Sequence, residues 1–301
     1  MSQTRALVST HRATRAYEPT TVLRGTLDDA AGLLASAGSV AVLTGAGVST
    51  DSGVPDYRGP TSQRATPMLY SEFVHDEANR RRYWARSFQG WGRMGRADPN
   101  PGHLALARWE HAGGDCPMTG LVTQNVDGLH ESAGSRRLVT LHGRIADVVC
   151  LACGDVSSRA EVQDRLAELN PGVRLREDAG HAELRPDGDA VVDEWADFRV
   201  AACRRCGGVL KPDVVYFGEP VPTDRVRAAY ETVDAAGALL VAGSSLTVMS
   251  GLRFARHAAR TGKPVVIVNH GATRADELAT VRLDLNTSVA LTGLAERLDV
   301  A

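Results

Sequence analysis

The stretch that most constrains the fold is Val40–Arg58, which reads VAVLTGAGVSTDSGVPDYR. It begins with a short apolar run, Val40–Leu43, which is too short for an independent helix and has the β-branched residues typical of a buried strand. Gly45 and Gly47 follow almost at once, and glycines here allow a sharp turn and a close approach of the backbone to a ligand. This order predicts a phosphate-binding loop whose amide groups lie at a helix N-terminus.

The loop differs from the usual dinucleotide-binding fingerprint. Thr50 stands where that fingerprint has its third glycine, and the ribose-binding acid expected about 20 residues further on is not obvious. The loop is instead rich in polar and ring groups, namely Ser49, Asp51, Asp56, Tyr57 and Arg58. Taken alone, the glycines fit equally well a plain strand–turn–helix unit in which they serve only packing.

Composition and charge exclude several classes of function. The chain has 301 residues, of which 43% are hydrophobic and 23% charged, so it can bury a large core in one domain or two lobes. The formal net charge of −2 argues against nucleic acid held by bulk electrostatics. Apolar runs fall short of the roughly 20 residues that span a bilayer, so we expect no membrane partner.

Two features bear on the cellular location. Five cysteines, four of them in pairs, indicate a reducing compartment and a metal site instead of a disulfide framework. Residues 1–17 contain arginines but no acid, a composition that faintly resembles an organellar transit peptide. We interpret residues 1–25 as a short disordered or loosely docked N-terminal arm. We expect a cytoplasmic location, with the mitochondrial matrix as the alternative.

Strand and helix patterns alternate along the chain, and the major strands end in small or amide residues. We expect strands at 40–43, 121–123, 138–141, 214–217, 238–242, 264–268 and 283–286, and helices at 26–37, 71–91, 101–112, 223–236 and 251–260. This alternation predicts an α/β fold with a Rossmann-like, doubly wound parallel sheet and ligand-binding loops along one edge.

Two cysteine pairs predict a metal site. Each pair, Cys150 with Cys153 and Cys203 with Cys206, has the C-x-x-C spacing that turns two thiolates toward one ion, and a glycine follows each pair. Four thiolates without histidine predict a closed tetrahedral zinc site, which is structural because no coordination position is open. Cys116 is unpaired, and we expect it to be a small buried residue.

His142 is the candidate general base. It follows a short apolar segment and precedes a glycine, and a neutral imidazole there can accept a proton. A lone histidine is more often structural. The amide-rich segment Gln124–Asp127 and the glycine loop favour catalysis, because all three are expected at the same edge of the sheet.

Together these motifs resemble the sirtuins, the NAD-dependent protein-lysine deacylases. The matching segments follow the family's order and lie at 45–58, 123–130, 141–143, the two cysteine pairs, 211–219, 243–245 and 268–271. Within the family, the chain is most similar to the class II, sirtuin-4-like members. This similarity rests on the sequence PDYR, the long gap between the cysteine pairs and RYWARSFQGW at 82–91.

The resemblance implies a domain organisation. A sirtuin catalytic domain would span residues 26–301. It would comprise a Rossmann-like lobe (26–60, 100–146 and 213–301), a helical insertion (61–99) and a smaller zinc-binding lobe (147–212).

The resemblance also implies site residues. His142 would be the base, with Asn125 and Asp127 beside it at the catalytic centre. The segment Val214, Val215, Tyr216 and Phe217 would pair with an acyl-lysine peptide as an added strand. The expected NAD-binding residues are Gly45, Ala46, Gly47, Ser49, Thr50, Asp56, Tyr57, Arg58, Gln124, Asn125, Val126, Asp127, Gly243, Ser244, Ser245, Asn269, His270, Gly271 and Val289.

In the mechanism that the resemblance implies, NAD is a co-substrate. The acyl-lysine carbonyl oxygen attacks the nicotinamide ribose, nicotinamide leaves, and His142 deprotonates a ribose hydroxyl that attacks the former acyl carbon. Water then releases lysine and O-acyl-ADP-ribose. Three alternatives are a protein ADP-ribosyltransferase on the same fold, an NAD-dependent oxidoreductase, and a zinc-ribbon module that binds nucleic acid.

The acyl group is a separate question. Tyr83 and Arg86 match the Y-x-x-R motif of sirtuins that remove malonyl, succinyl or glutaryl groups. An arginine there could bind the acyl carboxylate through two hydrogen bonds. Arg86 could equally point to solvent, because the aromatic helix that carries it can serve as an apolar wall.

Overall fold

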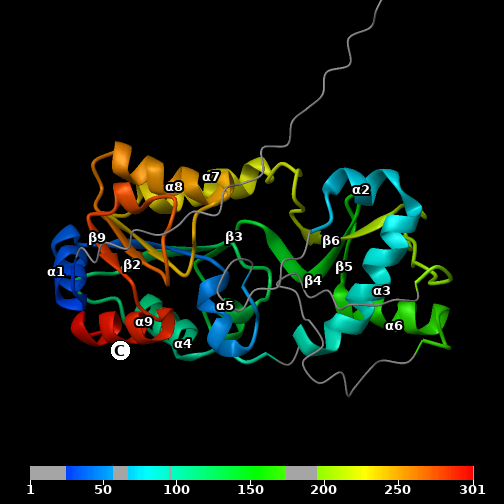
Figure 1. Ribbon diagram of the computed structural model, residues 1–301, viewed down its shortest axis with the longest axis horizontal. Helices are drawn as coiled ribbons and strands as arrows, with labels where there is room; N and C mark the ends of the chain where they lie inside the picture. The colour runs from blue at the N-terminus through cyan, green and yellow to red at the C-terminus, as the bar shows by residue number, and fades with distance from the viewer. Residues whose placement is uncertain (1–24, 57–66, 95–96, 174–194, 301) are drawn as a thin grey trace, which may run out of the picture.

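The computed structural model describes residues 25–56, 67–94, 97–173 and 195–300, and shows a larger and a smaller lobe side by side (Figure 1). Within these ranges, no helix combines the length and the apolar character that crossing a bilayer requires.

The larger lobe is built on a six-stranded sheet in which all neighbouring strands run parallel. The order is β3-β2-β1-β7-β8-β9, so the chain leaves the central β1 in one direction through β2 and β3 and returns to the other side through β7. Doubly wound sheets bind their ligands at such a reversal, beyond the carboxyl ends of the strands. The strands are β1 (Val40–Thr44), β2 (Met118–Thr123), β3 (Leu138–Thr140), β7 (Ala238–Ala242), β8 (Val265–Val268) and β9 (Val281–Leu283).

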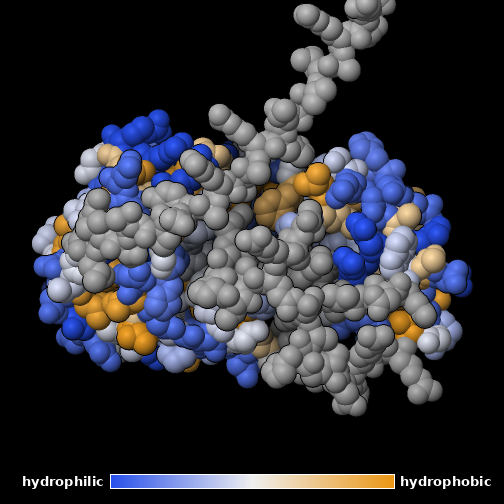
Figure 2. Space-filling model, in the orientation of Figure 1, coloured by the Kyte–Doolittle hydropathy of each residue, from blue (hydrophilic) through white to orange (hydrophobic). Residues whose placement is uncertain are grey.

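Helices cover both faces of this sheet (Figure 1). In β1, Val40 and Val42 pack in the core beneath α1, α4 and α9, whereas Ala41 and Leu43 pack in the core beneath α7 and α8. Burial on both faces explains the continuous apolar run in the sequence. Figure 2 shows hydrophilic residues along the upper left edge of the larger lobe, with single hydrophobic residues among them. The helices are α1 (Leu27–Ala37), α4 (Pro101–Ala112), α7 (Thr223–Asp234), α8 (Met249–Arg260) and α9 (Thr287–Arg297).

The smaller lobe combines a three-stranded antiparallel sheet, β5-β4-β6, with three helices. The buried Arg159 joins two of the helices: its Nη2 donates to the Ser87 carbonyl at 3.1 Å, and its guanidinium lies 5.4 and 5.0 Å from the ring centroids of Trp84 and Trp91. The helical module and the cysteine-bearing sheet therefore share one core. The elements are α2 (Tyr70–His75), α3 (Glu77–Met94), α6 (Arg159–Leu169), β4 (Gly143–Cys150), β5 (Val156–Ser158) and β6 (Leu210–Val214).

The doubly wound parallel sheet, the helical module and the smaller lobe confirm the predicted fold class. The helix expected at 71–91 is in fact two helices. Asp76 between them has an extended backbone, and its Oδ1 accepts a hydrogen bond from the Ala78 N–H at 2.8 Å, which starts α3.

Two predicted strands are misplaced. The strand expected at 214–217 lies at Leu210–Val214 as β6, on the edge of its sheet, where Pro212 is tolerated because an edge strand does not need every N–H. The strand expected at 283–286 is β9, Val281–Leu283. The segment after it forms α9, which the sequence analysis missed although Asn286 caps it by accepting from the Val289 N–H at 3.1 Å.

Candidate active site

The glycine loop packs against the loop that follows β7. The Gly47 N–H donates to the Gly243 carbonyl at 2.8 Å, and the Gly45 N–H donates to the Ala242 carbonyl at 3.1 Å. A Cβ built on Gly47 would lie 2.9 Å from Gly243 Cα, and one on Gly243 would lie 2.4 Å from the Val48 nitrogen. The glycines therefore let two backbones touch at the point where the sheet reverses direction.

The helix expected after the glycine loop is absent at this place. Two short 3₁₀ turns, Ala46–Val48 and Thr50–Ser52, follow β1 instead. The Thr50 hydroxyl donates to the Gly47 carbonyl at 3.1 Å. Thr50 thus closes the turn at the position where the dinucleotide fingerprint has a glycine.

Two side-chain amides tie the ends of three strands together. Gln124 Nε2 donates to the Thr44 carbonyl at 3.1 Å and to Ser244 Oγ at 2.8 Å. Asn125 Nδ2 donates to the Gly45 carbonyl at 3.1 Å and to Ser49 Oγ at 3.0 Å. The expected NAD-binding residues that follow β1, β2 and β7 therefore form one hydrogen-bonded group.

Asp127 belongs to a buried polar network behind this group. Its Oδ2 accepts from the Ser49 hydroxyl at 2.7 Å, and Ser49 Oγ also lies 3.4 Å from His103 Nε2. The His103 ring contacts the His130 ring at 4.7 Å between centroids, and His130 Nε2 lies 2.9 Å from Thr44 Oγ1. Within the described residues, His130 Nδ1 has no hydrogen-bond partner.

Burial sets the protonation states in this network. Burial raises the pKa of Asp127, although hydrogen bonds from the Leu129 N–H and the Ser49 hydroxyl act in the opposite direction. Burial lowers the pKa of His103 to about 4, and burial together with His103 lowers the pKa of His130 well below its usual range. The two imidazoles are therefore neutral at pH 7 and serve as hydrogen-bonding groups.

His142 follows β3 and lies beside the amide group. Its Nδ1 is 2.9 Å from the Gln124 carbonyl, and its Nε2 is 2.9 Å from Ser250 Oγ on α8. A carbonyl only accepts, so Nδ1 carries the proton and Nε2 carries the lone pair. Burial lowers the His142 pKa, the Gln124 hydrogen bond raises it, and the charge of Arg225 lowers it. A neutral imidazole with a lone pair on Nε2 is what a general base requires.

The remaining expected NAD residues lie after β8, on α9, in the loops that follow β1, β2 and β7, or outside the described ranges. Asn269 is buried after β8, and its Nδ2 donates to the His270 and Gly271 carbonyls at 2.7 and 3.1 Å. Val289 is 62% exposed on the first turn of α9, whose Thr287 hydroxyl donates to the Gly47 carbonyl. Ala46 lies in the first 3₁₀ turn, and Val126 and Asp56 are half-buried. The Ser245 hydroxyl forms a hydrogen bond with the Thr247 hydroxyl. Tyr57 and Arg58 lie outside the described residues.

The expected peptide-binding segment is organised by a buried lysine. Lys211 Nζ donates to the Pro212 carbonyl at 3.2 Å, the Val214 carbonyl at 2.6 Å and Glu219 Oε2 at 3.1 Å. Glu219 Oε2 in turn accepts from the Tyr216 N–H at 2.8 Å. The ammonium thus uses its three donors to hold the bend after β6.

This bend joins the larger lobe to the smaller one. The Val215 N–H donates to the His142 carbonyl at 2.8 Å, and the Phe217 carbonyl accepts from the Tyr70 N–H at 2.9 Å. Tyr83 is buried with its ring 5.4 Å from that of Tyr216, and Arg86, half-buried, lies one helical turn further along α3. The structure therefore places Tyr83 against the predicted substrate segment.

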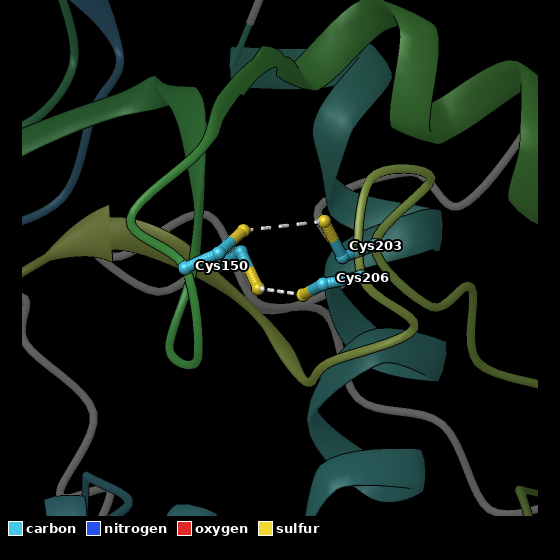
Figure 3. A group of neighbouring side chains, drawn as sticks. Cys150, Cys203 and Cys206 are labelled. Atoms are coloured by element: carbon cyan, nitrogen blue, oxygen red, sulfur yellow. Dashed lines mark hydrogen bonds between the residues drawn. The ribbon is translucent and has the colours of Figure 1, made fainter.

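The four paired cysteines converge in the smaller lobe (Figure 3). Their sulfur atoms all lie within 4.8 Å of one another, with 3.5 Å between Cys150 and Cys206 and 3.8 Å between Cys153 and Cys203. A zinc ion about 2.3 Å from each thiolate requires sulfur atoms roughly 3.8 Å apart, so the donor set fits one tetrahedral ion. Cys116 is buried elsewhere, as predicted, and its Sγ donates to the Leu34 carbonyl at 3.2 Å.

The sequence analysis missed Lys211, Glu219, Arg225 and Ser250. A signal for Lys211 existed, because it is one of two lysines, with Lys263, in a chain whose other basic residues are arginines. The contact between His142 and Ser250 joins residues 108 positions apart, and no local pattern reveals it.

We expect one zinc ion per chain, held by the cysteine cluster. Cys203→Ala removes one of four thiolates and should abolish stoichiometric zinc and unfold the smaller lobe, since structural zinc supplies on the order of 10 kcal/mol of folding free energy. Elemental analysis and near-UV circular dichroism measure both effects. Cys116→Ala, the control, should keep its zinc; a full equivalent of zinc in Cys203→Ala would contradict the assignment.

We expect acid to destabilise the protein through His103. The pKa of His103 is about 4 when folded and about 6.5 when unfolded, so its contribution is complete above pH 6.5 and is lost as the pH falls toward 4. The loss approaches about 3 kcal/mol, since one pKa unit is 1.36 kcal/mol. Urea titrations from pH 7 to pH 4 should show a shallower pH slope for His103→Gln than for the wild type. His75→Gln, at an exposed position, is the control, and equal slopes for His103→Gln and wild type would refute the expectation.

Comparison with known proteins agrees with the geometry. The profile of the Sir2 family matches residues 45–250. The chain is 56% identical over 260 residues to NAD-dependent protein deacetylase 1 of Mycobacterium avium (strain 104), covering 86% of this chain and 91% of that protein. It is 46% identical over 252 residues to the mitochondrial NAD-dependent protein lipoamidase sirtuin-4 of Bos taurus, covering 81% and 77%.

Solved structures show the same fold. One described as Sir2 with a p53 peptide and NAD⁺ superimposes with a TM-score of 0.73 at 28% identity, covering 92% of this chain and all of that one. Another, of Sir2Tm bound to a propionylated peptide, gives a TM-score of 0.69 at 26% identity, covering 92% and 100%. The chain therefore belongs to the Sir2 family.

Proposed function

We propose that the protein is an NAD-dependent protein-lysine deacylase that transfers the acyl group of an acyl-lysine to ADP-ribose and releases nicotinamide. The observation that carries the proposal is the neutral His142, with its Nε2 lone pair directed away from the Gln124 carbonyl, at the edge where the strand ends meet. The names of the bacterial relatives, NAD-dependent protein deacetylases at 48–56% identity, support it.

The residues at the strand ends fit a dinucleotide. Side-chain amides and hydroxyls that follow three strands surround a close backbone contact between glycines, where an added Cβ would clash. When bound, NAD supplies the ribose that accepts the acyl group. His142 Nε2 accepts a proton from a hydroxyl, and Asn125 and Ser49 hold the Asp127 side of the site in place.

The substrate side is the bend after β6. An extended acyl-lysine peptide would lie along the segment Val214, Val215, Tyr216 and Phe217 as an added strand. The exposure of Phe217 and Leu69, at 36% and 44%, supports an apolar edge for that peptide. Cytoplasmic location and the class II subtype stay predictions.

His142→Ala should abolish deacylation. Loss of a general base costs about 10²- to 10⁴-fold in rate, whereas His75→Ala, at an exposed position, should keep wild-type activity. The measurement is mass spectrometry of NAD products with acyl-lysine peptides. O-acyl-ADP-ribose with free lysine supports the deacylase. ADP-ribose attached to protein would favour the transferase alternative, and NADH would favour an oxidoreductase.

Arg86 provides a test of acyl preference. If its guanidinium binds an acyl carboxylate, Arg86→Ala should lower the activity on a succinylated peptide by about tenfold or more, since a hydrogen bond to a charged group contributes about 1.5–3 kcal/mol. Activity on the acetylated peptide should persist. Arg81→Ala on the same helix, where Arg81 pairs with Glu77, is the matched control. Equal loss on both peptides would count against the pair.

A further inference from the structure

Ser250 lies where α8 meets His142. It is the second residue of α8, and its Oγ is 2.9 Å from His142 Nε2. The residue that caps α8, Val248, has no side chain able to accept a hydrogen bond, and Ser250 Oγ is directed at the imidazole instead of capping the helix. The hydroxyl therefore has a partner at the candidate active site and not within its own helix.

The direction of this hydrogen bond follows from the other side of the ring. His142 Nδ1 faces the Gln124 carbonyl at 2.9 Å and must carry the proton. The neutral imidazole then has a single lone pair, on Nε2, and the Ser250 hydroxyl donates to it. The nitrogen that has to accept a proton during the reaction is thus the nitrogen that Ser250 occupies.

The residue after Ser250 makes the contact possible. A Cβ on Gly251 would lie 2.3 Å from Gln124 Oε1, so only glycine lets the first turn of α8 approach Gln124 this closely. The same Gln124 holds His142 Nδ1 through its carbonyl. Both anchors of the imidazole therefore lie where the first turn of α8 meets the end of β2.

The charged groups around His142 favour the neutral ring. Arg225 on α7 lowers its pKa, and Arg225 Nη2 is paired with Asp213 Oδ2 from β6 at 2.6 Å. The N-terminal end of α8, with its positive dipole, also faces the imidazole. An uncharged imidazole that accepts a hydrogen bond is consistent with each of these neighbours.

We infer that Ser250 is a positioning residue that caps Nε2 of His142 and yields that place to a substrate hydroxyl. The inference rests on the proposed function, because it takes His142 to be the base. One lone pair accepts one strong hydrogen bond, so the Ser250 hydroxyl and the substrate hydroxyl are mutually exclusive partners. Before it yields, Ser250 holds the ring at the angle that the incoming hydroxyl requires.

The test measures the hydrogen bond from Ser250 to His142 Nε2 in the absence of NAD and peptide. Diethyl pyrocarbonate acylates an imidazole through its free lone pair, and mass spectrometry of the peptide containing His142 follows the rate. Ser250→Thr and Ser250→Val have nearly the same shape but differ in the hydroxyl. We expect His142 to react about fivefold faster in Ser250→Val than in Ser250→Thr, which is the loss of one ordinary hydrogen bond.

Two further variants complete the experiment. Ser250→Ala should also react faster than the wild type, and Ser36→Ala should not, because Ser36 donates to the Gly32 carbonyl on α1. Equal rates in Ser250→Thr and Ser250→Val would overturn the inference. A wild-type protein that fails to deacylate any peptide would reject the proposed function, whereas the reagent would still report whether Nε2 is capped.

Discussion

The contact between the glycine loop and Gly243 determines how the rest of the candidate site is arranged. The Gly47 N–H and the Gly243 carbonyl bring the ends of β1 and β7 together at 2.8 Å, and this places Ser244 within reach of Gln124. The side-chain amide of Gln124 donates to Ser244 Oγ and to the Thr44 carbonyl, and its main-chain carbonyl orients His142. Its side-chain Oε1 lies close to Gly251, where a Cβ would clash with it. Gln124 thus links the strand end beside the glycine contact to the imidazole of His142.

The elements that could be predicted from the sequence are those with strong local signals. The helix after Thr26 has its capping box, β1 and β7 are continuous apolar runs, and the C-x-x-C spacing is sufficient to predict the sulfur cluster. The misplaced strand β6 lacked such a signal, because Lys211, Pro212 and Asp213 are poor strand formers that only its edge position and buried ion pair accommodate. Contacts such as His142 with Ser250 depend on the tertiary fold, which local patterns do not contain.

Lys211 illustrates why its residue type matters at the substrate side. Burial lowers the pKa of its ammonium, and the charge and hydrogen bond of Glu219 raise it, so the partner offsets the cost of removing the charge from water. The ammonium sits 4.8 Å from the centroid of the Tyr216 ring as well as donating to three oxygens. A planar guanidinium with a fixed fork of donors does not match this compact arrangement, which gives a physical reason for a lysine in a chain that otherwise uses arginine.

The buried network around Asp127 links catalysis to stability. The Ser49 hydroxyl donates to Asp127 and accepts from Asn125, so it holds two residues that are expected to bind NAD. The same hydroxyl lies next to the neutral His103 imidazole, which packs against that of His130. If His103 or His130 took up a proton, the positive charge would be buried away from water, which destabilises the folded protein. This cost is why burial lowers the pKa of both rings. The same burial that lowers the pKa of His142, and so keeps it available as a base, therefore also makes the support behind the site dependent on neutral pH.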